Sequence, residues 1–221
     1  MEQKIYCHCF HCVAGIILLG VSYGCTMPQP NQVTQSNSVT TTPTSIQTNN
    51  SQSNKPDTKT ATISIEGEDT PITLRFYKQY SSVFTTYYPD AEFLSQGVSS
   101  GEGTGVKFIA NFDGSKNEDA YVNLSFLNSF NSLEQLRSFV NGESGPIVSN
   151  GWQVVSRTQK TPYPWAQEQI VFRKGQDITG VVYLGQQNGK VFYTVTHYPV
   201  EYGDGFSPRA DLILKNLQVG G

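Results

Sequence analysis

Charged residues are scarce in this chain of 221 residues, of which they make up only 15%. Most of them lie after residue 60, and the formal net charge is −3. Proteins that bind nucleic acids instead gather Lys and Arg on one surface to neutralise phosphates. The composition therefore excludes nucleic acid as a partner.

Cysteine is absent after position 25. Three of the four cysteines, Cys7, Cys9 and Cys12, stand beside two histidines and resemble a zinc-binding cluster. Their spacing is tighter than that of a zinc site, no second ligand pair follows, and the segment belongs to a predicted signal peptide. We therefore predict no metal site. Removal of that segment leaves Cys25 alone, so we also expect no internal disulfide.

The chain has one continuous apolar run, residues 13–21. The run is too short to span a bilayer, which takes about 20 helical residues, but it matches the apolar core of an export signal. Gly24 directly before Cys25 is similar to the lipobox of bacterial lipoproteins, in which the signal is removed and the cysteine is acylated. We predict a lipoprotein signal peptide over residues 1–24 and lipid attachment at Cys25. Ordinary secretion and an uncleaved anchor are the alternatives.

Residues 26–60 contain no aromatic side chain and are about two-thirds Ser, Thr, Asn and Gln. Such a segment cannot bury enough apolar surface to offset its conformational entropy. We expect a disordered tether over residues 25–60, with an average span of roughly 30–35 Å for a flexible coil. A Gln/Asn-rich aggregation element is the alternative, which the prolines of the segment disfavour.

Nearly all aromatic residues lie in residues 61–221, which we assign to one folded domain. Alternation of apolar and polar residues predicts strands with one buried face. Asn188-Gly189 favours a two-residue hairpin turn, and Lys174-Gly175-Gln176-Asp177 is expected to form the hairpin before it. The expected strands cover residues 106–112, 122–126, 152–157, 166–172, 178–184 and 191–198.

Two helices are expected. Ser132 and Gln135 form a capping box, and Gly142 ends the first helix. Ser207 as N-cap and Pro208 at the first helical position start the second. The apolar stripes are Leu133, Leu136 and Val140 in the first helix, and Ala210, Ile213, Leu214 and Leu217 in the second. Together the elements predict an α+β fold, an antiparallel β-sheet flanked by helices in an α/β/α sandwich.

This order of elements resembles the PsbP-like family, which includes the photosystem II extrinsic protein PsbP, its cyanobacterial lipoprotein relatives and DcrB-type bacterial envelope lipoproteins. The family opening, an aromatic strand that runs into Tyr-Pro and a large aromatic residue, is matched by Phe84, Tyr87, Tyr88, Pro89 and Phe93. The family ending is matched by Val191-Phe192-Tyr193, Pro199, Phe206, Ala210 and Leu214. The resemblance covers residues 82–219 and implies non-enzymatic binding or assembly work at a membrane surface.

Two loops have the composition of a ligand site. Oxygen-bearing side chains alternate over residues 113–119, as in a calcium loop, but Glu118 and Leu124 stand where an EF-hand needs Gly and Glu. We expect a solvated hairpin loop there. The second loop contains Gly101, Gly103 and Gly105. These glycines lack the spacing of a dinucleotide-binding motif, so we expect a flexible turn there.

His197 is the only histidine after residue 25, and it lies in an alternating strand, where we expect a structural role. The acidic run Glu66-Gly67-Glu68-Asp69 is expected to be a solvated loop. Because no motif pairs a base with an activated nucleophile, we predict no catalytic residue and no cofactor. An envelope hydrolase that uses His197 is the enzymatic alternative.

The segment Thr161-Pro162-Tyr163-Pro164-Trp165 is the strongest candidate for a partner-binding surface. Prolines hold a loop extended at low entropic cost, and Tyr and Trp often anchor interfaces. We therefore take Tyr163 and Trp165 as partner-binding candidates. The alternative is a rigid loop with Trp165 in the core.

Signal, tether and resemblance together predict an exported, monomeric, non-catalytic lipoprotein that faces the periplasm, a thylakoid lumen or the cell exterior. Its expected partners are the membrane, through the N-terminal lipid, and a membrane protein complex, which would be photosystem II in a photosynthetic source. A module that binds a small ligand or an ion is the alternative.

Overall fold

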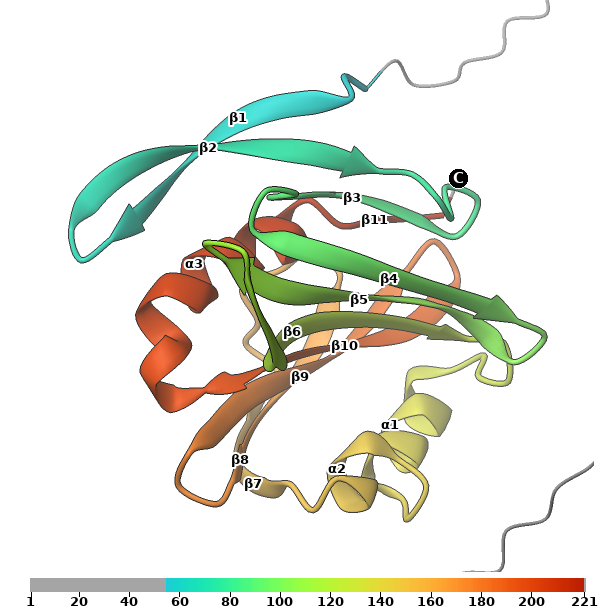
Figure 1. The fold of residues 1–221 in the computed structure, drawn as a ribbon. Helices are drawn as coiled ribbons and strands as arrows, with labels where there is room; N and C mark the ends of the chain where they lie inside the picture. Colours follow the sequence, from blue (N-terminus) through green and yellow to red (C-terminus); the bar gives the residue numbers. More distant parts are fainter. Residues whose placement is uncertain (1–54, 221) are drawn as a thin grey trace, which may run out of the picture. The chain divides into compact units, whose positions relative to one another are not determined.

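The structure, a computed structural model, describes residues 55–220. The predicted signal peptide, Cys25 and nearly all of the predicted tether lie outside these residues. Two antiparallel sheets and a few helices make up the described part (Figure 1). The predicted α+β class is therefore confirmed. None of the helices in residues 55–220 has the length and apolar character needed to cross a bilayer.

The larger sheet has seven strands in the order β4-β5-β6-β10-β9-β8-β7. Asn188 and Gly189 take positive φ angles of 50° and 75°, so the predicted tight turn between β9 and β10 is confirmed. All six strands expected from alternation belong to this sheet, and β4 joins them at one edge. The strands are β4 (Phe93–Ser100), β5 (Gly103–Phe112), β6 (Ser115–Leu127), β7 (Gln153–Thr158), β8 (Ala166–Lys174), β9 (Ile178–Gln187) and β10 (Lys190–Pro199).

A second sheet has four strands in the order β1-β2-β3-β11. Of these, only the aromatic strand β3 was expected, through the family resemblance, and the sheet itself was not anticipated. Its strands are β1 (Thr58–Ile65), β2 (Glu68–Tyr77), β3 (Phe84–Tyr88) and β11 (Gln218–Val219). β1 begins before residue 61, where the folded domain was expected to start. Glu66 and Gly67 form the β1–β2 turn at φ angles of 52° and 87°. The acidic run therefore lies in a hairpin, with Glu68 and Asp69 already in β2.

The first helix, α1 (Leu133–Asn141), agrees with the sequence. The Ser132 side chain accepts a hydrogen bond from the Gln135 backbone N–H at 3.2 Å. The Gln135 side chain accepts one from the backbone N–H of Asn131, one residue before the N-cap. Gly142 follows the helix, and the short helix α2 (Pro146–Ser149) comes next.

The start of the last helix was predicted wrongly. The chain passes through a 3-10 turn, η1 (Val200–Tyr202), and enters α3 (Gly203–Lys215) before Ser207, so that Pro208 lies inside the helix. Phe206 is fully buried, and its ring lies 4.9 Å from that of Tyr198 and 5.9 Å from that of Phe93. Burial of this ring stabilises helical turns that two glycines and a proline would disfavour.

Helices cover both faces of the seven-stranded sheet, as the sandwich prediction required. α1 and α2 lie on one face, and α3 lies on the other with the small sheet beside it (Figure 1). The α3 side is mainly aromatic: Phe126 stacks on Phe84 at 5.0 Å and on Phe192 at 4.7 Å. The buried residues on the α1 side are mainly aliphatic, apart from Trp152 and Phe172, whose rings stack at 4.0 Å.

Gly103 and Gly105 lie within β5, so the expected flexible turn is limited to Gly101 and Glu102. A Cβ atom at Gly103 would come within 2.3 Å of the Phe126 carbonyl oxygen, and one at Gly105 within 2.8 Å of the Leu124 oxygen. These glycines therefore permit close contact between β5 and β6 rather than mobility.

The two edge strands of the large sheet differ in how well they are protected against pairing with a further strand. β7 carries a bulge, because its register with β8 shifts between Val154 and Ser156, and Arg157 follows the bulge. β4 pairs with β5 in unbroken register and carries no charged residue over its whole length. Bulges and charges are the usual protection of sheet edges, so β7 is protected and β4 is not.

Candidate functional site

Helix α1 separates two recesses on one face of the large sheet. Leu136 and Val140 pack into the core beneath it. Because successive residues of a helix turn by about 100°, Phe139 projects from one flank and Arg137 from the other. Phe139 lines an apolar recess toward the β4–β5 turn and the end of β6, and Arg137 lines a charged recess toward β7 and β8.

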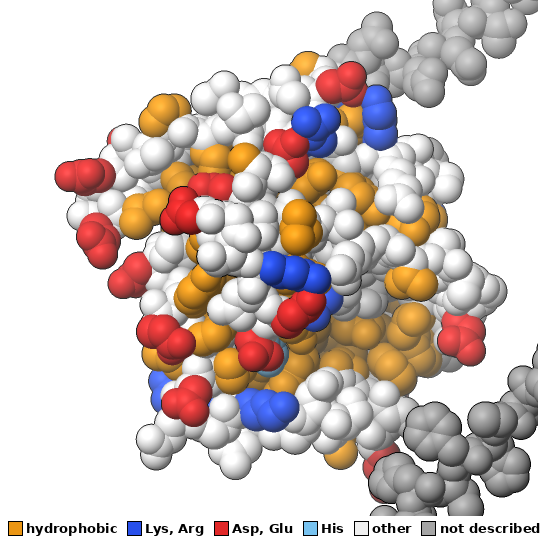
Figure 2. All heavy atoms as spheres, in the orientation of Figure 1, with side chains coloured by type: hydrophobic (Ala, Val, Ile, Leu, Met, Phe, Trp, Pro, Cys, Tyr) orange, Lys and Arg blue, Asp and Glu red, His pale blue; other side chains and the backbone are white. Residues whose placement is uncertain are grey.

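The first recess, here called the aromatic groove, is formed around Leu127, Phe130 and Phe139. It consists of two adjoining hollows of about 620 and 480 Å³ that share Ser129 and both Phe side chains. The rings of Phe130 and Phe139 lie 5.0 Å apart, and Tyr193 on β10 lies 6.2 Å from Phe139. Figure 2 shows hydrophobic side chains gathered here, between the strands and α1.

The aromatic groove is partly open to solvent, since Leu127, Phe130 and Phe139 are only half-buried. The polar residues that line it include the carboxylates Glu102 and Glu134, and no Lys or Arg is among the described residues of its wall. An apolar surface rimmed by polar residues is typical of an interaction site. The carboxylates favour an occupant that is neutral or basic around an apolar side chain.

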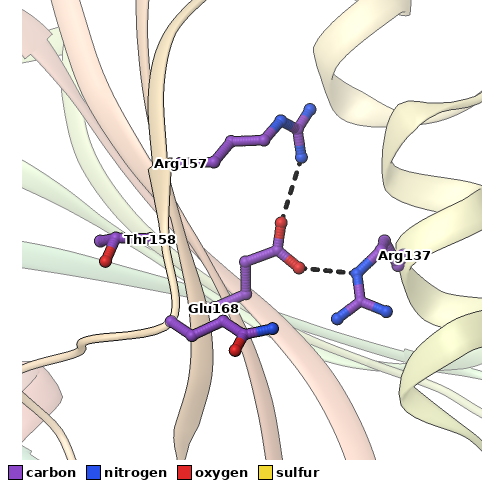
Figure 3. A pocket seen from close by; sticks show the side chains of 5 residues that line it. Arg137, Arg157, Thr158 and Glu168 are labelled. Atoms are coloured by element: carbon purple, nitrogen blue, oxygen red, sulfur yellow. Dashed lines mark hydrogen bonds and ion pairs between the residues drawn. The ribbon is translucent and has the colours of Figure 1, made fainter.

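The second recess, here called the arginine recess, is formed by Arg137, Arg157, Thr158, Gln159 and Glu168 and has a volume of about 360 Å³. Glu168 accepts a hydrogen bond from Arg137 Nε at 2.7 Å and one from Arg157 Nη1 at 3.2 Å. In Figure 3 the two guanidinium groups approach the carboxylate from α1 and from β7.

The carboxylate of the arginine recess is buried, and the two arginines that reach it are more exposed. The Glu168 side chain is only 9% exposed, whereas each arginine side chain is 39% exposed. A buried carboxylate without a cation is strongly destabilising, so the fold must bring a positive group to this position. Arg157 also donates to the Asn141 side chain at the end of α1, which ties the helix to the sheet edge.

The sequence analysis did not select these three charged residues. Arg137, Arg157 and Glu168 come from α1, β7 and β8, and no spacing rule connects them. Glu168 also follows a register shift in β8, which alternation alone does not reveal. One sequence signal was available: Glu168 is a carboxylate within a strand that otherwise alternates toward the core.

Tyr163 and Trp165, the partner-binding candidates, lie in the core at 5% and 2% exposure. Their rings stack at 5.1 Å. Trp165 Nε1 donates to the Leu214 carbonyl oxygen, and the Tyr163 hydroxyl donates to Asp211 at 3.0 Å. Burial, together with neighbouring Tyr183 and Asp211, raises the pKa of Tyr163. The structure thus favours the alternative considered from the sequence, a rigid loop with Trp165 in the core.

His197 is also buried, at 6% exposure, which agrees with the structural role expected for it. Its ring stacks on Tyr121 at 4.8 Å, and Nδ1 lies 2.7 Å from the Asp119 carbonyl oxygen, where it donates a hydrogen bond. Burial lowers the pKa of His197, which favours the neutral ring. The imidazole is therefore held by packing and by one hydrogen bond to the backbone.

The acidic loop at residues 113–119 forms a tight turn rather than a wrapped loop. Asp113 and Gly114 occupy the turn at φ angles of 52° and 78°, and β6 begins at the next residue. Glu118 forms an ion pair with Lys116 at 2.5 Å. Within residues 55–220, no group of three His, Cys, Asp or Glu side chains is placed to hold a metal ion.

Comparisons with known proteins give few matches. No family model matches the chain, and no curated protein matches it. Among the solved structures that do match is the solution structure of cyanobacterial PsbP from Synechocystis sp. PCC 6803. The identity is 14% and the TM-score 0.45, over 66% of this chain and 92% of that chain.

Proposed function

We propose that this protein is a membrane-anchored lipoprotein whose folded domain binds a protein partner at the membrane surface and catalyses no reaction. The observation that carries the proposal is the aromatic groove, where Phe130 and Phe139 remain half-exposed beside a well-packed core. The partner would present an apolar side chain flanked by neutral or basic groups, to match Glu102 and Glu134.

The anchoring part of the proposal rests on the sequence. An apolar run of export-signal length ends shortly before Gly24-Cys25, and a segment rich in Ser, Thr, Asn and Gln leads to the folded domain. A lipid on Cys25 would hold the domain within reach of the membrane surface. The resemblance of the sequence to the PsbP-like family makes photosystem II the first partner to test in a photosynthetic source.

Replacement of Cys25 tests the anchor. We expect Cys25→Ser to abolish labelling by a radioactive or clickable fatty acid in cells and to move the protein from the membrane fraction to the soluble fraction. Cys12→Ser is the matched control, because it removes a cysteine from the predicted signal peptide and should change neither property. Membrane retention of unlabelled Cys25→Ser would contradict lipid anchoring.

Site-specific crosslinking in the native membrane tests the groove. A photoreactive amino acid at Ser138, which lines the groove, should capture one defined protein, and Phe139→Ser should abolish that crosslink. Ser149, an exposed serine on α2, is the matched control position. Equal capture from both positions, or capture that persists in Phe139→Ser, would contradict binding through the groove.

A further inference from the structure

The arginine recess holds more positive charge than its own carboxylate neutralises. Two guanidinium groups face Glu168, so the three side chains together carry one net positive charge. The other residues that line the recess, Thr158 and Gln159, are uncharged. Because an ion pair of one arginine with one carboxylate is already neutral, the second arginine leaves a surplus.

Other arginines of the described domain do not share this arrangement. Arg209 pairs with Glu92 through two hydrogen bonds of 2.7 and 2.9 Å, and Arg75 pairs with Asp90, one cation for each carboxylate. Among the ion pairs of residues 55–220, Glu168 is the only carboxylate that two arginines share. Glu118 is also shared by two cations, Lys116 and Lys107, but its side chain is exposed. Among these ion pairs, only the arginine recess therefore combines a surplus cation with a buried carboxylate.

Hydrogen-bond donors are also left over. Arg137 uses Nε for Glu168, and its two Nη groups have no hydrogen-bond partner among the described residues. Arg157 uses Nη1 for Glu168 and Nη2 for Asn141. The carboxylate holds Arg137 in position from one side, so that the remaining planar N–H groups are oriented before any ligand arrives. Such a fork suits the paired oxygens of a carboxylate or a phosphate.

Access and size fit a small group. The recess is open to solvent, each arginine side chain is 39% exposed, and the volume of about 360 Å³ exceeds the roughly 30 Å³ that one water molecule occupies in the liquid. We propose that the arginine recess is a binding site for an oxyanion, a carboxylate or phosphate group, held by Arg137 and Arg157 with Glu168 as the residue that positions them.

The test uses the Cys25→Ser chain, which lacks the proposed lipid, and follows the arginine Nε–Hε signals by NMR during titration with sodium phosphate or sodium acetate. Sodium chloride at matched ionic strength is the reference. We expect saturable shifts of the Arg137 signal with phosphate or acetate, and the tighter of the two identifies the preferred group. A linear response equal to that of chloride would overturn the proposal.

Variants separate binding from a purely structural ion-pair network. Arg137→Gln leaves Arg157 on Glu168 and should weaken anion binding about tenfold or more. Glu168→Gln removes the competing negative charge and should tighten binding several-fold. Arg173→Gln, which removes an exposed arginine from β8, is the matched control and should leave the affinity unchanged.

A network that serves stability alone predicts no saturable anion response in any variant. Lower melting temperatures in Arg137→Gln and Glu168→Gln are expected in either case, because Glu168 is buried. If Glu168→Gln does not fold, Arg137→Lys keeps the charge without the planar fork and should still lose affinity. Unchanged affinity in Arg137→Lys and Arg137→Gln would overturn the site.

A second part of the experiment identifies the source of the oxyanion. Phosphatidylcholine vesicles with and without phosphatidylglycerol are offered to the Cys25→Ser chain. Binding to the anionic vesicles that depends on Arg137 assigns the group to a lipid headgroup, and saturable binding of free phosphate without vesicle binding assigns it to a small soluble molecule. The site lies on the opposite flank of α1 from the aromatic groove, so this outcome is independent of the proposed function.

Discussion

Two buried polar residues of this domain, Thr86 and His197, are each held by a hydrogen bond to a distant backbone carbonyl. The Thr86 hydroxyl donates to the Ile213 carbonyl oxygen at 2.6 Å, and His197 donates to the Asp119 carbonyl oxygen. Buried polar groups need such partners, because the hydrogen bonds that they make to water in the unfolded chain are lost on folding. These contacts join residues far apart in the sequence, and alternation of apolar and polar residues does not identify them.

His197 predicts how the stability of the domain depends on pH. Burial, with smaller contributions from Lys174 and Lys107, lowers its pKa below the ordinary value of 6.5, despite the opposing contacts with Asp119. The unfolded chain therefore binds a proton at a higher pH than the folded chain does. It follows that the free energy of unfolding falls as the pH drops below about 6.5.

Urea unfolding at pH 7.5, 6.5 and 5.5 checks this prediction. The unmodified chain should lose stability over that range, and His197→Gln, which cannot titrate, should lose less. The variant is expected to be less stable at pH 7.5, since it gives up the stacking contact with Tyr121. An equal loss in both proteins would show that other groups set the pH dependence.

At the scale of elements, a paired arginine connects α3 to the loop before β4. Arg209 donates two hydrogen bonds to Glu92 and lies over the Phe112 ring, 4.9 Å from its centre. Both side chains are mostly buried, at 15% and 27% exposure. A lysine has neither the fork nor the planar face that these contacts use.

Arg209→Lys is therefore expected to lower the free energy of unfolding by about 1–2 kcal/mol, as one charged hydrogen bond and the ring contact are lost. Urea denaturation followed by tryptophan fluorescence measures the change. Lys215→Arg, in the exposed pair with Asp211, is the control and should change stability by less than about 0.5 kcal/mol. A loss of the same size in the control would contradict the argument.

The elements that the sequence predicted are those whose local pattern agrees with their final packing. β6 alternates between the core and the other face, and α1 begins directly after its N-cap Ser132, as its capping residues indicate. β4 was missed because its residues after Phe93 are exposed on both faces and show no alternation. The start of α3 was missed because the burial of Phe206 overrides the local signal of Ser207 and Pro208.

For the molecule as a whole, the folded part begins earlier than its composition indicates. The Asp57 carbonyl oxygen accepts a hydrogen bond from the Phe76 N–H, and the Pro56 carbonyl oxygen accepts one from the Tyr87 hydroxyl at 2.7 Å. Lys59 donates to Asn216 at 2.5 Å, close to the other end of the domain. Residues with the composition of a linker are thus joined to the small sheet.

Two shortened chains test this boundary. A chain that begins at Lys55 should keep the melting temperature of the Cys25→Ser protein. A chain that begins at residue 61 loses the contacts of Pro56, Asp57 and Lys59 and should be less stable by about 2–3 kcal/mol, at roughly 1 kcal/mol for each net hydrogen bond. Equal melting temperatures of the two chains would place the boundary of the stable domain at residue 61.

The candidate sites were harder to predict from the sequence than the fold was. Tyr163 and Trp165 were selected because aromatic residues between prolines often lie at interfaces, but the same residues also fill cores, and only the packing against α3 decides between the two. The arginine recess depends on three elements that the topology brings together. Lipid attachment at Cys25 remains a prediction from the sequence alone.

The unequal edges of the large sheet limit how copies of this domain can associate. If β4 of one molecule pairs with β4 of another, both regular edges are consumed, and only the bulged β7 edges remain on that sheet. A bulged edge is a poor template for a further strand. Strand pairing through this sheet would therefore end at a pair of molecules and would not propagate into a fibril.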